Sequence, residues 1–356
     1  MERLPNLDPL RFILASLVIF FHIQLLSRNQ GLPYYLEIPI FNRGPEAVNM
    51  FFVLSGFLII KGIYKHKQHG SFSIKTFYIK RVLRIFPLYY LVVIFGFIFY
   101  WLLLPALDIP YNNNYNLVEG VLLATFFLPN VLDELHKPGG ILEVLWSIGI
   151  EEQFYIIIAP LLYFVGKYKI LTALSLLTIA YFIVFHLDSM DVLRTYQFLY
   201  FFLFAGGVIA ILEEKKQLQF LKWSPLMPIA VVVCTGLYFM TNLFEFQVLW
   251  LRNALTMVLF SLFIHSLAHN KVGKAIKIKF LNYLGRISYG IYMFHVIALN
   301  ISMFFVLKAR EQFILNDTIS ILSIYILTFG ITILMAHVSY VYYESYFLKL
   351  KTKFRQ

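Results

Sequence analysis

The chain has 356 residues, of which 60% are hydrophobic and 14% are charged, and its formal net charge is +11. Soluble domains reach only about 45–50% apolar residues and carry about 25% charged ones. The composition excludes a soluble enzyme, a disordered chain and a fibrous repeat, and it indicates a polytopic membrane protein. The positive charges fall in short loops between apolar runs, a pattern that sets membrane orientation, so we expect no nucleic-acid partner.

A helix needs roughly 20 mainly apolar residues to cross a bilayer. Ten such runs predict an all-α fold with about ten transmembrane helices, at residues 9–27, 46–64, 86–104, 141–165, 170–187, 193–212, 225–243, 248–267, 284–307 and 318–342. A shorter apolar stretch, residues 117–129, predicts a re-entrant or interfacial helix. We expect these elements to form one membrane domain over residues 1–356, with no appended soluble catalytic domain.

Lysine and arginine gather in alternate loops and in the tail, mainly at residues 61–84, 215–222, 271–279 and 349–355. The positive-inside rule places such segments in the cytoplasm. With ten spans, this distribution predicts that both termini are cytoplasmic. The single cysteine, Cys234, allows no internal disulfide, and no cluster of metal-ligating residues is evident, so we expect no metal site.

The first predicted helix carries two ionisable residues, Arg11 and His22, and Asp8-Pro9 predicts its start with Asp8 as the N-cap. At 100° per residue the two side chains share one stripe, with a rise of roughly 16 Å between them. Ionisable groups inside a bilayer mark functional sites by default. A cation near the membrane surface, at Arg11, and an imidazole deep in the membrane, at His22, suit an anionic substrate with a long neutral arm. The alternative is that Arg11 reaches lipid phosphates and His22 pairs with a polar neighbour.

The second and third predicted spans add two features. Ser55-Gly56 in the second span predicts a close approach between helices. Arg81 and Arg84 end the most basic loop at an i, i+3 spacing, so they share a helical face and could grip one polyphosphate. Anchoring by positive charge alone is the alternative for this pair. Pro87 predicts that the third span begins there.

The fourth predicted span contains two adjacent acids about ten residues after its start, Glu151 and Glu152. Neighbouring side chains on a helix point about 100° apart, so one acid at most faces a given cavity. Glu151 shares a stripe with Ser147 and Tyr155, which makes it the candidate functional acid. A structural acid paired with arginine or histidine is the alternative.

The ninth predicted span begins with polar residues at helical spacing. Ser288, Tyr292 and His295 fall at i, i+4 and i+7 and therefore share one face. Hydrogen bonds between neighbouring helices would account for these polar residues as well as a functional role does.

Five segments in this order resemble the type 3 acyltransferases, a family of bacterial integral-membrane O-acyltransferases. They are residues 7–11 with His22, residues 51–59, residues 81–89, residues 146–155 and residues 287–295. The resemblance implies transfer of an acyl group, usually acetyl, from cytoplasmic acyl-CoA to a hydroxyl of a cell-surface polysaccharide or lipid-linked sugar. It also implies a multi-pass protein of the bacterial inner membrane, in contact with its lipids, that uses acyl-CoA as co-substrate and needs no other cofactor.

The resemblance and the residues together suggest roles for the candidates. Arg81 and Arg84 would hold the CoA phosphates, with Arg11 at the entrance. His22 would act as general base or as the site of an acyl-histidine intermediate, and Glu151 would orient its imidazole or stabilise the imidazolium. Hydrogen bonds to the acceptor or to the oxyanion would come from Ser288, Tyr289 and His295.

A transporter or flippase for a sugar or lipid is the rival hypothesis, because many spans with buried charges fit it equally well. It predicts repeats and broken helices near the midplane. No repeat is visible between residues 1–170 and 171–342, and the candidate Arg, His and Glu residues crowd into the first half. The acceptor, the donor chain length and the oligomeric state do not follow from the sequence.

Overall fold

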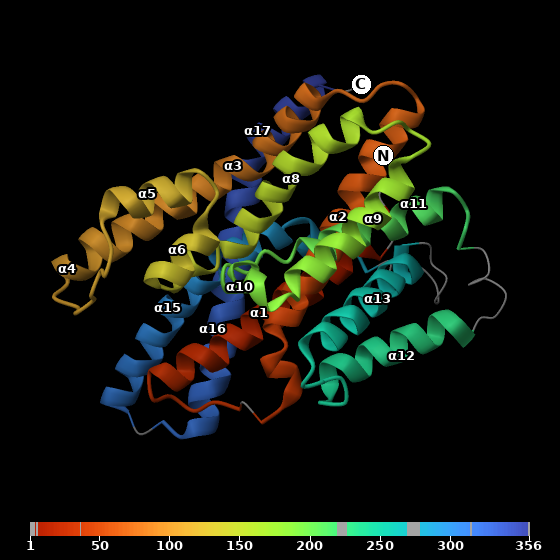
Figure 1. The fold of residues 1–356 in the computed structure, drawn as a ribbon. Coiled ribbons are helices and arrows are strands. Elements are labelled where there is room, and N and C mark those ends of the chain that lie inside the picture. The colour runs from red at the N-terminus through yellow and green to blue at the C-terminus, as the bar shows by residue number, and fades with distance from the viewer. Residues whose placement is uncertain are drawn as a thin grey trace.

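The computed structural model describes residues 4, 6–35, 37–218, 226–268, 278–313 and 315–354. Within these ranges every regular element is a helix, which confirms the expected all-α fold (Figure 1). Two predicted inner loops, residues 215–222 and 271–279, lie partly outside the described residues.

The bundle is built from ten longer helices: α1 (Leu7–Asn29), α2 (Gly44–Gln68), α3 (Ile74–Ile98), α8 (Trp146–Phe164), α9 (Ile170–Phe185), α11 (Tyr200–Glu214), α12 (Leu226–Met240), α13 (Leu249–Ala268), α15 (Ser288–Gln312) and α16 (Asp317–Val338). Shorter helices connect or extend them: α4 (Leu104–Ala106), α5 (Leu117–Thr125), α6 (Pro129–His136), α7 (Gly140–Glu143), α10 (Asp191–Thr195), α14 (Lys279–Arg286) and α17 (Ser345–Leu350). Two π-helical segments, Phe99–Leu103 and Ser339–Glu344, join α3 to α4 and α16 to α17.

In the described part of the chain, six helices are long and apolar enough to cross a membrane, or seven if α9 and the segment Asp188–Thr195 form one span bent by 93°. The chain is therefore a multi-pass membrane protein, but the expected count of about ten spans is only partly matched. Helices occupy all ten predicted runs, yet α11 and α12 have only 15 residues each. Gln197, with a left-handed backbone (φ 55°), interrupts the run 193–212, and α8 carries two acids that lower its mean hydropathy.

The two ends of the described chain lie at the same end of the bundle. Leu4 and Leu7, at the start of α1, line the same cavity as Leu348 of α17 and the following Lys351. An even number of crossings has this geometry. The cytoplasmic placement of both ends stays a prediction.

Two helix starts differ from the prediction. The N-cap of α1 is Asn6, in the left-handed region (φ 66°), and Asp8 lies in the first turn. Pro9 remains compatible because the first four amide groups of a helix have no partner within it. Pro87 does not begin the third span but lies inside α3, which starts at Ile74. Proline has no N–H group to donate within the helix. The hydroxyl of Tyr343 donates a hydrogen bond to the Pro87 carbonyl at 3.1 Å.

The apolar stretch 117–129 forms no single helix. It holds α5 and the first residue of α6, with Phe127 in the left-handed region (φ 59°) between them. In Figure 1, α5 runs beside the far part of α3, where α3 continues through the π-helical segment to α4. Val118 and Phe126 are 65% and 69% exposed, as expected for an element at the edge of the bundle. A re-entrant or interfacial position for it stays a prediction.

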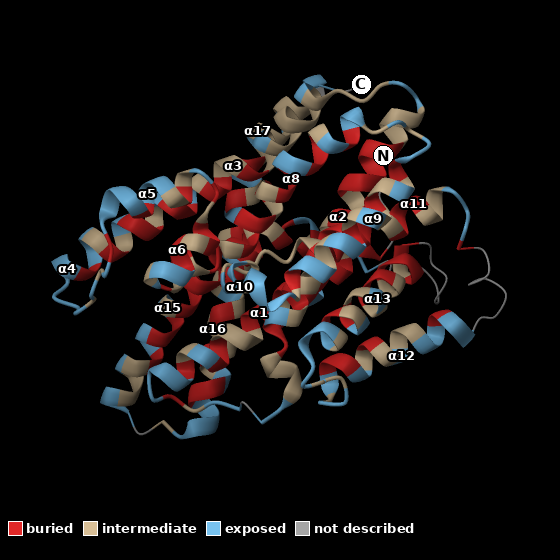
Figure 2. Cartoon of the chain, in the orientation of Figure 1, coloured by how far each residue is buried: buried red, intermediate tan, exposed pale blue. Residues whose placement is uncertain are grey.

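The centre of the bundle is the packing of α2 against α11, both largely buried (Figure 2). Glycines allow the two backbones to meet. A methyl group at Gly56 would overlap the carbonyl of Leu203, and one at Gly206 would overlap the carbonyl of Val53. The predicted close approach at Ser55-Gly56 is thus confirmed for Gly56. Because Ser55 lies one residue away on the helix, its side chain is free to line a pocket instead.

Substitution of Gly56 by Ala is expected to destabilise the protein by about 2 kcal/mol or more, because the backbone of α11 has no room to move away. Thermal unfolding in detergent measures the effect. Gly236→Ala in α12 is the matched control: its new methyl group meets nothing within 4 Å, and the change should be neutral or stabilising by about 0.5–1 kcal/mol. Equal melting temperatures for the two variants would contradict this packing account.

Candidate active site

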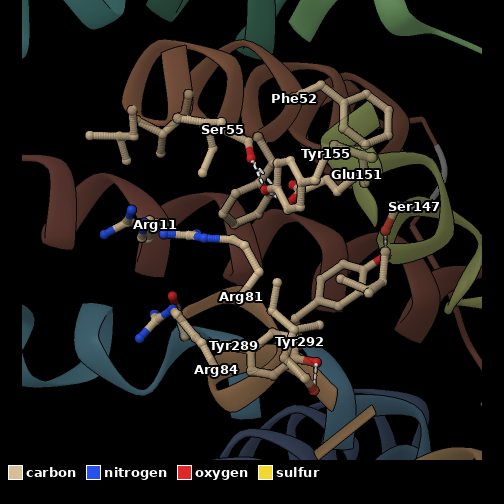
Figure 3. A pocket seen from close by; sticks show the side chains of 18 residues that line it. Arg11, Phe52, Ser55, Arg81, Arg84, Ser147, Glu151, Tyr155, Tyr289 and Tyr292 are labelled. Carbon is tan, nitrogen blue, oxygen red and sulfur yellow. Dashed lines mark hydrogen bonds between the residues drawn. The ribbon is translucent and has the colours of Figure 1, made fainter. Parts of the chain in front are cut away.

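Side chains from five helices enclose a pocket of about 150 Å³, which we call the inner pocket. It lies among α1, α2, α3, α8 and α15 (Figure 3). Its polar lining comprises Arg11, Ser55, Arg81, Arg84, Ser147, Glu151, Tyr155, Ser288, Tyr289 and Tyr292.

A larger cavity of about 890 Å³, which we call the basic cavity, opens at the end of the bundle where both described ends of the chain lie. Its charged or titratable lining comprises Asp8, Arg11, Lys61, Lys65, His66, Lys80, Arg81, Arg84, Arg286, Tyr340 and Lys351. Arg11, Arg81 and Arg84 belong to both walls, so they stand where the two cavities adjoin.

The three arginines enter this junction from two helices, Arg11 from α1 and Arg81 and Arg84 from α3 (Figure 3). Arg11 is paired with Asp8, with Nη1 3.1 Å from Oδ1. The Arg81 guanidinium carbon lies 5.9 Å from the centre of the Tyr155 ring, and its buried Nε has no hydrogen-bond partner. Within the described part of the chain, neither Arg81 nor Arg84 forms an ion pair, so both remain available to an anion.

Glu151 faces the inner pocket and is held by two hydroxyl groups. Ser55 Oγ donates to Glu151 Oε2 at 3.1 Å, and the Tyr155 hydroxyl donates to the same oxygen at 2.7 Å. The two hydroxyl groups are themselves 2.5 Å apart. This triangle joins α2 to α8 beside the arginines (Figure 3). Glu151 has no hydrogen bond to His22 among the described residues, so it does not orient that imidazole directly in this structure.

The partner of His22 is His295 of α15. Their Nδ1 and Nε2 atoms, respectively, are 3.2 Å apart, and the ring centres are 4.8 Å apart. His22 Nδ1 also lies 2.9 Å from the Val18 carbonyl, and His295 Nδ1 lies 2.5 Å from the Tyr292 carbonyl. His295 is fully buried.

For two neutral rings, these contacts assign the tautomers. Carbonyl oxygens only accept, so His295 Nδ1–H donates to Tyr292 and leaves His295 Nε2 as an acceptor. His22 Nδ1–H then points toward Val18 and His295, and the proton of His22 is assigned to Nδ1 from the hydrogen bonds. In this assignment His22 Nε2 carries a lone pair and has no hydrogen-bond partner among the described residues, which is the state a general base requires.

Tyr292 joins the histidine pair to the inner pocket. It lines the pocket, and its ring centre is 5.6 Å from that of His295. Its hydroxyl donates to the Val144 carbonyl at 2.9 Å and lies 2.7 Å from Ser147 Oγ. The histidine pair therefore lies directly behind the end of the pocket that Ser147 and Tyr292 form.

Six of the eight residues singled out from the sequence line the inner pocket: Arg11, Arg81, Arg84, Glu151, Ser288 and Tyr289. The other two, His22 and His295, contact each other beside it. The hydroxyl of Tyr289 donates to the Ile85 carbonyl at 3.0 Å. No group of three His, Cys, Asp or Glu side chains suited to a metal occurs in the part of the chain that the structure describes.

Sequence reasoning missed two residues of these cavities. Ser55 was assigned to helix packing, although its hydroxyl binds Glu151. Lys351 carried no signal beyond the positive charge of the tail, yet it lines the basic cavity. Burial, together with the nearby Arg81, Arg84 and Lys80, lowers the pKa of Lys351 to about 7.

These features define a class: a multi-pass membrane protein with an internal cation-lined pocket beside a pair of histidines. A family model described as an acyltransferase domain matches residues 4–337, and the chain belongs to this family of membrane acyltransferases. The match confirms the resemblance that the five sequence segments carry.

Several curated proteins are similar to this chain. Peptidoglycan O-acetyltransferase OatA of Listeria monocytogenes is 27% identical over 330 residues, covering 83% of this chain and 49% of the relative. Putative acetyltransferase ORF330 of Acidianus two-tailed virus is 24% identical over 304 residues, covering 82% of each chain. Putative peptidoglycan O-acetyltransferase YrhL of Bacillus subtilis is 27% identical over 171 residues, covering 46% of this chain and 24% of the relative. The chain thus spans about half the length of the Listeria relative. No solved structure matches.

The hydroxyl triangle around Glu151 generates a prediction for Ser55→Ala and Tyr155→Phe. Each single change should cost about 1–3 kcal/mol of unfolding free energy, because it leaves a buried carboxylate with one donor fewer. The double variant should cost less than the sum by about 0.5 kcal/mol or more, since the two hydroxyls share one acceptor. Denaturant unfolding in detergent measures all three variants, and strict additivity would contradict the triangle.

Proposed function

We propose that the protein transfers an acyl group, which we take to be acetyl, from cytoplasmic acyl-CoA to a hydroxyl of a cell-surface polysaccharide or lipid-linked sugar. Family membership supports acyl transfer. The single observation that carries the proposal is the contact between His22 and His295 beside Tyr292, which lines the same inner pocket as the three arginines.

The donor enters through the basic cavity in this proposal. Arg81 and Arg84 bind its phosphates, because guanidinium groups bind phosphate oxygens bidentately and stay charged. Arg11 stands where the basic cavity adjoins the inner pocket. The neutral pantetheine arm then follows the inner pocket toward Tyr292, which brings the thioester to the histidine pair.

The chemical step uses His22 Nε2 as general base. It takes the proton of the acceptor hydroxyl while that oxygen attacks the thioester carbonyl carbon. A carbon–oxygen bond forms, the carbon–sulfur bond breaks, and the CoA thiolate leaves and takes a proton from the imidazolium. His295 Nε2 accepts from His22 Nδ1–H throughout, which holds the ring and stabilises its charged form. A route through an acyl-His22 intermediate would use the same nitrogen.

Glu151 acts in this proposal as the acid that balances the guanidinium groups in the inner pocket. Ser55 and Tyr155 keep its carboxylate turned toward the pocket. Ser288 and Tyr289, on the α15 side, are proposed to contact the acceptor or the oxyanion.

The names of the relatives support a cell-wall glycan as the acceptor class. Two of them are named as peptidoglycan O-acetyltransferases, one of these putatively. A bacterial inner-membrane location with cytoplasmic termini fits the same proposal, since the basic cavity then opens toward cytoplasmic acyl-CoA.

The test is acyl transfer by purified protein with radiolabelled acetyl-CoA and a crude cell-wall glycan acceptor. His22→Ala should lower the rate of transfer about 10²–10⁴-fold, because it removes the base and leaves the residues that bind the donor in place. His186→Ala is the control; this histidine contacts Asn253 away from the pocket, and its loss should leave the rate near wild type.

Two outcomes would contradict the proposal. Near-normal transfer by a folded His22→Ala protein would remove His22 as the base. If the wild-type protein neither consumed nor bound acetyl-CoA, acyl transfer itself would be refuted.

A further inference from the structure

The last membrane helix continues past the end of the family match. The match stops at residue 337, whereas the chain runs on through the π-helical segment Ser339–Glu344 and α17 to Lys351. This continuation packs against α3, the helix that carries Arg81 and Arg84. Tyr340, Leu348 and Lys351 thereby become part of the wall of the basic cavity.

The basic cavity has two kinds of lysine. On the α2 side, Lys61 pairs with Glu213 at 2.5 Å and with Glu214 at 3.2 Å, and Lys65 pairs with Glu214 at 3.2 Å. Their charges are therefore balanced by carboxylates of α11.

On the α3 side the carboxylates lie beyond ion-pair distance among the described residues, although Glu151 interacts with Arg81, and Glu344 with Arg84, at longer range. Lys80, Arg81, Arg84 and Lys351 line the cavity together, and within the described residues none of them forms an ion pair. Four like charges around one space repel one another unless an anion lies between them. Burial, and after it the repulsion by these neighbours, lowers the pKa of Lys351 to about 7. An anion with more than one negative charge is the ligand that this wall suits.

We propose that Lys351 binds a phosphate group of the acyl-CoA donor, so that the continuation beyond the family domain forms part of the donor site. This inference rests on the proposed function, which supplies acyl-CoA as the ligand. The ammonium group of Lys351 serves as a point charge beside the bidentate guanidinium groups of Arg81 and Arg84. The lysine touches the phosphate end of the donor and takes no part in the chemical step.

The experiment compares two donors that differ in their phosphates. Acetyl-CoA carries them, whereas S-acetylpantetheine has the same thioester and arm without any phosphate. Lys351→Gln should raise the KM for acetyl-CoA about tenfold, the loss expected for one charge-assisted contact, with kcat unchanged. Its KM for S-acetylpantetheine should equal that of the wild type. Lys351→Arg, which keeps the charge, should restore most of the affinity for acetyl-CoA.

Lys353→Gln is the matched control, since this lysine is exposed and does not line the cavity. It should leave both KM values unchanged. If Lys351→Gln kept the wild-type KM for acetyl-CoA, the inference would be overturned. Turnover by the wild-type protein would still support the proposed function. An equal rise in KM for both donors would also overturn the inference, by showing a general disturbance of the cavity. If Lys351→Gln left both KM values unchanged but removed the gain in stability that anionic lipid gives the wild type, the lysine would bind a lipid phosphate instead of the donor.

Discussion

Charged side chains are costly among membrane helices, and the interior of this bundle depends on how that cost is met. Near α11 it is met internally, because Lys61 is 4% exposed and pairs with Glu213 and Glu214. Near α3 the arginines have no such partners among the described residues. Cations that share a cavity without ion-pair partners repel one another, and an anion that enters the cavity would reduce this repulsion.

The same constraint explains the order of groups along the interior. Cations lie at the wide end, where a hydrated polyphosphate can enter with little loss of solvation. The inner pocket, which Glu151 and Tyr292 also line, is much smaller, with a volume of about 150 Å³. Beside it the two histidines contact each other, and each also lies within hydrogen-bond distance of a backbone carbonyl of its own helix.

Helical periodicity predicted the faces of single helices well. The stripe of Ser147, Glu151 and Tyr155 does line one pocket, because 3.6-residue spacing fixes directions within one helix. Contacts between helices lie beyond such reasoning: His22 and His295 are 273 positions apart, and nothing local pairs them. Local rules also misplaced two boundaries, since Pro87 is tolerated inside α3 and a left-handed Gln197 shortens an apolar run. Lys351 gave no signal, because its role arises only from the return of the last helix to α3.

The central claim is that one molecule of acyl-CoA bridges the arginines and the histidine pair. The most direct measurement is a structure of the protein, reconstituted in lipid, with a non-hydrolysable acyl-CoA analogue. The account predicts phosphates in contact with Arg81 and Arg84, and the carbonyl of the acyl group near His22 Nε2, with room for an acceptor hydroxyl in hydrogen-bond reach of that nitrogen. An analogue whose nucleotide lies outside the basic cavity, or whose acyl group ends away from the histidine pair, would contradict it.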